Sequence, residues 1–213
     1  MNRRQFIRTL SLAGAGALVG SGLNPATGAE KNGTGKTMDI LILTGSPRKD
    51  GNSNFLAEEF MRGAREAGHK TFRFDAAGAN VHPCIACNAC GMDGPCVFKD
   101  DFEIVRERIV PADMVVFATP MYYFGLSAQL KAVIDRFYAI NGQIHTPKKA
   151  ALLMTYANTV ESQARPIASH YDTLLDYLGW SDSGRVIAPG VWPAGSIKST
   201  RYPQMAYELG KNV

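Results

Sequence analysis

Apolar residues follow two alternating patterns along the body of the chain. Short uninterrupted apolar runs, such as Met-Val-Val-Phe-Ala from residue 114, are typical of strands that helices cover on both faces. Between these runs, apolar positions recur three or four residues apart, as they do in amphipathic helices. The pattern predicts strands at residues 38–43, 70–75, 114–119, 150–155 and, weakly, 185–187. It predicts helices at residues 52–68, 101–110, 127–138, 162–178 and 202–210.

Strands and helices alternate throughout this region, which is the order of elements in α/β proteins. Buried apolar strands joined by helices predict a parallel sheet with helices on both faces. We therefore expect an α/β fold with a flavodoxin-like, doubly wound, five-stranded parallel sheet in the order 2-1-3-4-5. The domain is expected to span residues 38–213, after a linker at residues 30–37.

The first 29 residues differ in composition from the rest of the chain. Arg3 and Arg4 precede an apolar stretch of 14 residues, 10–23, and small residues at 27–29 precede Glu30. This resembles a bacterial twin-arginine export signal, so residues 1–29 are expected to direct the protein to the periplasm and to be removed. An uncleaved anchor is the alternative, but a helix needs about 20 apolar residues to span a bilayer. We therefore expect no membrane span after cleavage.

The charge of the expected mature chain is nearly balanced. The whole chain has 23 basic and 19 acidic residues, and Arg3, Arg4 and Arg8 lie in the expected signal. Removing these three leaves 20 basic residues against 19 acidic ones. Because a nucleic-acid-binding domain usually carries a clustered basic face, we expect no nucleic-acid partner. A hydrophobic content of 46% is enough for a packed core and excludes a disordered chain.

The loop after the first expected strand is rich in groups that bind phosphate. In a sheet of this order, a ligand lies beyond the carboxyl ends of the first and third strands. Residues 45–54 offer the hydroxyls of Ser46 and Ser53, the guanidinium of Arg48 and the amides of a helix N-terminus. Helix-end amides and arginine both favour an anion such as phosphate. The alternative is an ordinary helix start capped by Asn52 or Ser53, with Arg48 in solvent.

The loop after the third expected strand is unusually apolar. Residues 119–125 read Thr-Pro-Met-Tyr-Tyr-Phe-Gly, where a surface loop is normally polar. A flat and largely apolar ring system such as isoalloxazine would cover these side chains. The alternative is an aromatic patch covered by a neighbouring subunit, and the two interpretations are compatible.

Together these loops resemble those of the NADPH-dependent FMN reductase group of the flavodoxin superfamily. The resemblance covers residues 38–155 and includes Gly-Ser-Pro-Arg at 45–48, Asn-Ser-Asn at 52–54, the segment 119–125 and Ile-Asp-Arg at 134–136. It implies FMN as cofactor, NAD(P)H as a candidate electron donor and a homodimer or homotetramer. The residues implied for the FMN phosphate are Ser46, Arg48, Ser53 and Asn54. Those implied for the flavin ring are Pro120, Met121, Tyr122 and Phe124, with Thr155 closing the third side.

All four cysteines of the chain lie close together in the connection after the second strand. They are Cys84, Cys87, Cys90 and Cys96. Four thiolates at such short spacing can bind one iron-sulfur cubane. The spacing resembles the compact motif of the iron-sulfur flavoprotein family, which implies a [4Fe–4S] cluster that relays electrons to FMN. Structural zinc, disulfides and free thiols remain alternatives.

No pair of side chains stands out as a general acid and base, and Asp135, Arg136, His145 and His170 are interpreted as ion-paired, solvated or packed residues. A flavin performs the redox chemistry itself, so no catalytic side chain is expected. The leading hypothesis is an FMN-dependent oxidoreductase with an iron-sulfur relay, served by a small redox protein. The second is an NAD(P)H-dependent flavin or quinone reductase without a cluster. The third is an FMN-binding electron carrier with no small-molecule substrate.

Overall fold

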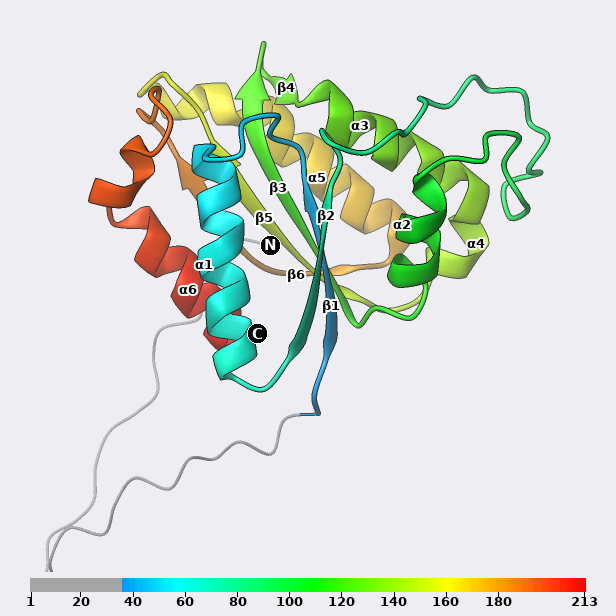
Figure 1. Cartoon of the computed structure of the whole chain (residues 1–213), viewed down its shortest axis with the longest axis horizontal. Helices are drawn as coiled ribbons and strands as arrows, with labels where there is room; N and C mark the ends of the chain where they lie inside the picture. Colours follow the sequence, from blue (N-terminus) through cyan, green and yellow to red (C-terminus); the bar gives the residue numbers. More distant parts are fainter. Residues whose placement is uncertain (1–35) are drawn as a thin grey trace, which may run out of the picture. The chain divides into compact units, whose positions relative to one another are not determined.

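The computed structural model describes residues 36–213 (Figure 1). The expected export signal at 1–29 and the expected linker up to residue 35 lie outside the described residues. The strands are β1 (Asp39–Thr44), β2 (Lys70–Asp75), β3 (Met114–Tyr122), β4 (Gly125–Leu126), β5 (Lys149–Thr155) and β6 (Ser181–Ala188). The α-helices are α1 (Asn52–Glu66), α2 (Phe102–Ile109), α3 (Ala128–Asp135), α4 (Asn141–Ile144), α5 (Arg165–Leu178) and α6 (Tyr202–Lys211). Three 3-10 turns, η1 (Arg136–Ile140), η2 (Glu161–Ala164) and η3 (Ser196–Ser199), complete the described elements.

The sheet has the predicted order. Five parallel strands run β2-β1-β3-β5-β6, and the short β4 pairs only with β3, in antiparallel orientation. The order therefore equals the predicted 2-1-3-4-5 once β4, which the sequence pattern did not reveal, is set aside. The switch point lies between β1 and β3, as predicted.

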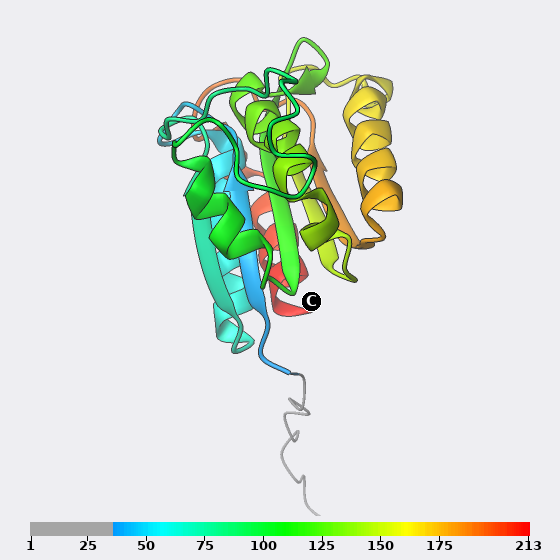
Figure 2. The same cartoon turned by 90° about the vertical axis from the view of Figure 1, so that its right-hand side faces the viewer.

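Helices cover both faces of the sheet, as Figure 2 shows. On one face α1 and α6 pack on a buried cluster that includes Ile42, Val116 and Phe60. On the other face α2, α3 and α5 pack on a second cluster that includes Leu43 and Phe117. Successive residues of β1 and β3 thus enter opposite clusters, which explains why these strands are apolar throughout.

The helix boundaries differ from prediction where polar or proline residues interrupt the pattern. The predicted helix at 127–138 ends as α3 at Asp135 and continues as η1 and α4. The predicted helix at 162–178 begins as η2, and α5 starts with Pro166 in its first turn, where a missing amide hydrogen costs nothing. The last strand, β6, is longer than predicted. It is an edge strand, and its partly exposed polar residues do not show the apolar pattern of a buried strand.

Lys148 is a buried lysine that satisfies backbone carbonyls at the end of α2. Its ammonium donates to the carbonyl oxygens of Val110 at 2.9 Å and Ala112 at 2.8 Å, and burial lowers its pKa. We expect Lys148→Met to lower the free energy of unfolding by about 1.5–3 kcal/mol, because both carbonyls lose a charged donor. Urea denaturation measures this loss. Lys149→Met, at the exposed neighbouring position, is the control and should change stability by less than about 0.5 kcal/mol.

Candidate functional site

A cavity of about 450 Å³ opens at the switch point of the sheet. Its wall comes from the loop after β1, the end of β3, the segment after β5 and the segment after β6. Seven of the nine residues predicted to bind the cofactor line it: Ser46, Arg48, Ser53, Pro120, Met121, Tyr122 and Thr155. Asn54 and Phe124 are not part of this wall, and their predicted contacts with the cofactor stay predictions.

The loop after β1 forms one end of the cavity. The hydroxyl oxygen of Ser46 accepts a hydrogen bond from the Arg48 amide at 3.3 Å, and the Asn54 side chain donates to the Arg48 carbonyl at 2.7 Å. These bonds fold the loop back on the N-terminus of α1. A Cβ added to Gly51 would lie 2.4 Å from the Ser46 hydroxyl oxygen, so the loop needs glycine there. Asn54 thus helps to fix the conformation of the loop, through its hydrogen bond to the Arg48 carbonyl.

Two polar atoms at this end of the cavity lack a partner. The hydroxyl of Ser53, which lines the cavity, and the amide oxygen of Asn54 are buried, and neither has a hydrogen-bond partner within residues 36–213. The N-cap of α1 is Gly51, and no side chain caps the helix, so a cap by Asn52 or Ser53 is wrong, although Arg48 is exposed as that alternative expected. The unpaired hydroxyl and the uncapped helix amides fit a phosphate group.

Asn52 connects this loop to the segment after β6. Its side-chain amide donates to the carbonyl oxygen of Pro193 at 2.9 Å and accepts from the amide of Ile197 at 3.2 Å. These bonds hold the segment that carries Val191 and Trp192 at the cavity. Neither residue was predicted from the sequence, although their position just beyond a strand end was the available signal.

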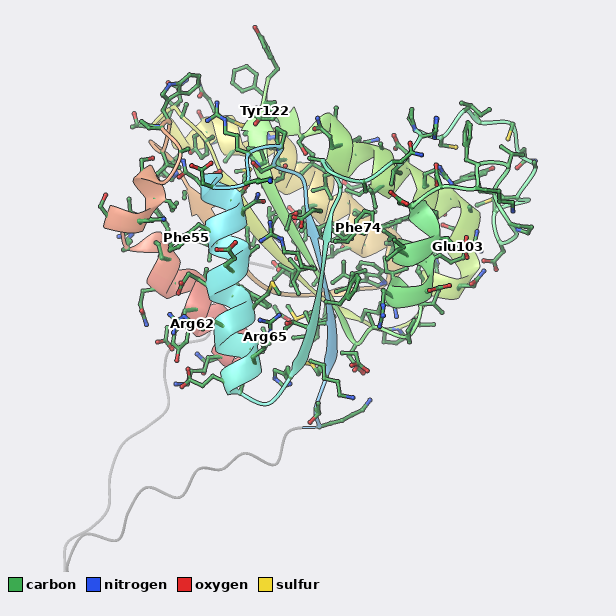
Figure 3. The ribbon with its side chains drawn as sticks, in the orientation of Figure 1. Phe55, Arg62, Arg65, Phe74, Glu103 and Tyr122 are labelled. Carbon is green, nitrogen blue, oxygen red and sulfur yellow. The ribbon has the colours of Figure 1, made fainter. Side chains whose placement is uncertain are left out.

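The end of β3 and β4 form a hairpin, and its residues Met121 and Tyr122 line the cavity. Met121 pairs with Leu126 and Tyr122 with Gly125, so the predicted loop at 119–125 is a continuation of the strand and a tight turn. The two turn residues, Tyr123 and Phe124, have φ values of 44° and 63°. Figures 1 and 3 show the hairpin projecting from the carboxyl edge of the sheet, with Tyr122 at its base. The tip is aromatic and exposed, and Tyr123 is 100% exposed.

The segment after β5 supplies the third side of the cavity. Thr155 is buried, and Tyr156 follows it with a pKa that burial raises. The Tyr156 amide donates to Ala188 and its carbonyl accepts from Val191, which joins the ends of β5 and β6. Of the residues of this segment that line the cavity, Thr155 was predicted from the sequence, and Tyr156 and Ala157 were not.

The four cysteines line a second, much smaller cavity of about 20 Å³. Cys84 and Cys87 are exposed, Cys90 and Cys96 are half-buried, and no disulfide joins them. In the described part of the chain, no three His, Cys, Asp or Glu side chains are grouped as a single metal ion requires. The four cysteines line one cavity, and their predicted binding of a single cluster stays a prediction.

The loop that carries the cysteines has an unusual backbone. Ala86, Asn88 and Met92 have φ values of 55°, 57° and 71°, in the left-handed region that residues other than glycine seldom adopt. Such strain persists only where surrounding structure holds it, and it concentrates at functional sites. Here the backbone carbonyl of Met92 accepts from Asn141, and Asp93 accepts from the amide and side chain of Gln143. Figure 1 shows this loop above α2 and α4 and to the right of α3, away from α1.

The sheet order and the cavity at its switch point define a flavodoxin-like protein. The sequence also matches the model of the NADPH-dependent FMN reductase family over residues 38–188, and the chain belongs to that family. Among residues 36–213, no helix has both the length and the apolar character needed to cross a membrane.

Several iron-sulfur flavoproteins are similar in sequence. One from Methanocaldococcus jannaschii is 35% identical over 99 residues, which are 46% of this chain and 51% of the relative. One from Archaeoglobus fulgidus is 26% identical over 160 residues, 73% of this chain and 70% of the relative. A Bacillus subtilis protein named as an NAD(P)H-dependent FMN-containing oxidoreductase is 25% identical and covers 82% of this chain and 97% of its own. Several matches to iron-sulfur flavoproteins thus span only about half of the relative's length.

Solved structures share the fold. An NAD(P)H:quinone oxidoreductase from Methanothermobacter marburgensis has a TM-score of 0.66 at 22% identity, over 83% of this chain and 96% of that one. An azoreductase from Bacillus anthracis has a TM-score of 0.63 at 16% identity, over 83% of this chain and all of that one. At these identities the likeness shows the flavodoxin-like fold alone.

Proposed function

We propose that the protein is an FMN-dependent oxidoreductase that binds FMN in the 450 Å³ cavity at the switch point. The observation that carries the proposal is the presence of two unlike sets of groups in one cavity. One set is the uncapped start of α1 with the unpartnered Ser53 hydroxyl, and the other is Met121 and Tyr122. FMN has a phosphate at one end and an apolar ring at the other.

The chain's own residues bind and orient the cofactor. Ser46, Ser53 and the exposed Arg48 hold the phosphate through hydroxyl and guanidinium donors. Met121, Tyr122 and the 70% exposed Trp192 also line the cavity and would contact the apolar ring. When bound, FMN supplies the transfer of one or two electrons, so the protein needs to provide binding, orientation and exclusion of water.

For the second cavity we propose a [4Fe–4S] cluster on Cys84, Cys87, Cys90 and Cys96. The support is the convergence of four thiols on one cavity within a strained and well-anchored loop, together with the names of the iron-sulfur flavoproteins that match. Thiolates are the usual ligands of such clusters. The cluster would relay electrons between FMN and a small redox protein.

A reductase without a cluster is the second candidate. The Bacillus subtilis relative favours it, because its name describes an NAD(P)H-dependent FMN-containing oxidoreductase. In that case NAD(P)H would donate electrons, a quinone would be a suitable acceptor, and the four cysteines would be thiols, disulfides or zinc ligands. An FMN carrier without a small-molecule substrate is the third, and steady turnover of NAD(P)H with a quinone would exclude it.

The first experiment is an assay of iron, sulfide, zinc and FMN in the anaerobically purified chain. The proposal expects one FMN and about four irons and four sulfides per chain. One FMN without metal selects the reductase without a cluster. One zinc selects the structural zinc alternative, and absence of FMN excludes the central proposal.

Export to the periplasm by the twin-arginine route is also a proposal, and it rests on the pattern of residues 1–29. Replacing Arg3 and Arg4 with lysine should retain the protein in the cytoplasm, as fractionation of a bacterial host would show. A homodimer or homotetramer remains a proposal that the family resemblance suggests, and sedimentation of the FMN-loaded chain tests it.

A further inference from the structure

Arg136 is a buried charge with no part in the proposed flavin site. It begins η1 directly after α3 and is only 2% exposed. A guanidinium is never neutral at ordinary pH, so its burial costs free energy unless an anion and hydrogen-bond acceptors compensate. The acceptors around Arg136 therefore show what holds this charge inside the protein.

Arg136 bonds to both ends of the loop that carries the cysteines. Its guanidinium donates to the carbonyl oxygen of His82 at 2.9 Å, two residues before Cys84. It also donates to the two carboxylate oxygens of Asp100 at 2.9 and 3.2 Å, four residues after Cys96. The backbone amide of His82 donates to Asp100 as well, at 3.0 Å. Arg136 and Asp100 thus close the base of the loop.

Asp100 is ionised in this arrangement. Burial raises its pKa, but the hydrogen bonds from Arg136 and from two backbone amides outweigh burial, and the pKa lies below the usual range. The two groups therefore form a buried bidentate ion pair, in which the carboxylate side chain is 3% exposed and the guanidinium side chain 2%.

The ion pair has a defined orientation relative to the cysteines. Arg136 lines the cavity of the four thiols, together with Phe98, whose ring lies 5.4 Å from the guanidinium carbon. Asp100 does not line that cavity and faces a neighbouring one, beside Asp93 and Arg106. The Arg136 Nε is buried and has no hydrogen-bond partner among residues 36–213. Of the two members of the pair, only Arg136 therefore lines the cysteine cavity.

We propose that Arg136 is a positioning residue of the cysteine centre and that its charge favours the reduced state of the cluster held there. The inference rests on the proposed [4Fe–4S] cluster. A cluster with four thiolate ligands carries negative charge that increases on reduction. A fixed cation beside the cluster stabilises the more negative state, and nearby charge and hydrogen bonds to sulfur set cluster potentials.

The test is an EPR-monitored reductive titration of the full, anaerobically purified chain. In Arg136→Met we expect the one-electron reduction equilibrium of the cluster to become tenfold less favourable, which is a fall of about 59 mV in midpoint potential. Arg136→Lys keeps the charge and should recover most of the potential. If Arg136→Met has the same midpoint potential as the wild type, the proposed effect of the charge is wrong.

Arg106→Met is the matched control. Arg106 also anchors the loop, by donating to the carbonyl oxygens of Gly94 at 2.9 Å and Ala139 at 3.3 Å. Its Nε is buried and lies 3.4 Å from a carboxylate oxygen of Glu103. It does not line the cysteine cavity. We expect Arg106→Met to leave the midpoint potential within the error of the titration. Equal shifts in the two variants would reduce Arg136 to a structural anchor and overturn the inference.

If the wild-type protein contains no iron, the proposed cluster is wrong. Hydrogen exchange then tests whether Arg136 positions the cysteines. In the FMN-loaded chain, the amides of residues 84–98 should exchange about tenfold faster in Arg136→Met than in the wild type, because the base of the loop opens. Unchanged exchange would show that Arg136 does not position the cysteines.

Discussion

Ser53→Ala is expected to weaken FMN binding by about 10- to 150-fold without lowering the stability of the protein free of FMN. The hydroxyl lines the cavity and has no hydrogen-bond partner within the described residues. A hydrogen bond to a charged group contributes about 1.5–3 kcal/mol, and each 1.4 kcal/mol is a tenfold change in affinity. Removing an unsatisfied buried hydroxyl from the free protein has no such cost. Fluorescence titration with FMN and urea denaturation measure the two effects.

Riboflavin and a second serine provide the controls for this result. Riboflavin lacks the phosphate, so its affinity should be the same for the wild type and Ser53→Ala. Ser127 is equally buried, but it accepts a hydrogen bond from the Leu130 amide as the N-cap of α3. Ser127→Ala should therefore lower stability by about 1 kcal/mol and leave the ratio of FMN to riboflavin affinity unchanged. Equal losses for FMN and riboflavin in Ser53→Ala would contradict the placement of the phosphate.

The sheet could be predicted from the sequence because its central strands are buried on both faces. β1 and β3 have continuous apolar runs that no amphipathic helix would show. β6 was predicted too short because it is an edge strand, where polar residues such as Asp182 and Arg185 pair with each other in partial exposure. The β3–β4 hairpin was hidden because its turn contains Tyr123 and Phe124 in place of the usual glycine or asparagine.

The candidate site was predictable only where one loop carried a dense set of suitable groups. The loop at 45–54 contains several hydroxyl, amide and guanidinium groups close together. Trp192, in contrast, lies among prolines, glycines and alanines after a strand that the sequence pattern predicts only weakly. Its place at the cavity depends on Asn52, which lies about 140 residues earlier and binds the Pro193 carbonyl. Likewise Arg136 was interpreted as an ordinary ion-paired residue, since only the fold brings it to His82 and Asp100.

Cys87→Ser is expected to remove the iron and sulfide of the chain almost completely and to leave its FMN content unchanged. A cubane with four thiolate ligands loses one of them, and the exposed position of Cys87 lets water reach the open iron. FMN should remain, because no residue that lines the cysteine cavity also lines the flavin cavity. The measurement is iron, sulfide and FMN per chain after anaerobic purification, with the visible spectrum of the bound flavin as a check on folding.

Ile85→Ser separates loss of a ligand from damage to the loop. Ile85 lines the same cavity, is 60% exposed and lies two residues before Cys87, so the substitution introduces the same side chain into the same strained segment. It should retain about four irons per chain, because no thiolate is lost. Iron content that falls equally in both variants would show that the loop, and not the thiolate, controls assembly. Four irons retained both in Cys87→Ser and in Cys87→Ala, whose side chain cannot bind iron, would mean that the cluster does not need the Cys87 thiolate, and the assignment of Cys87 would be wrong.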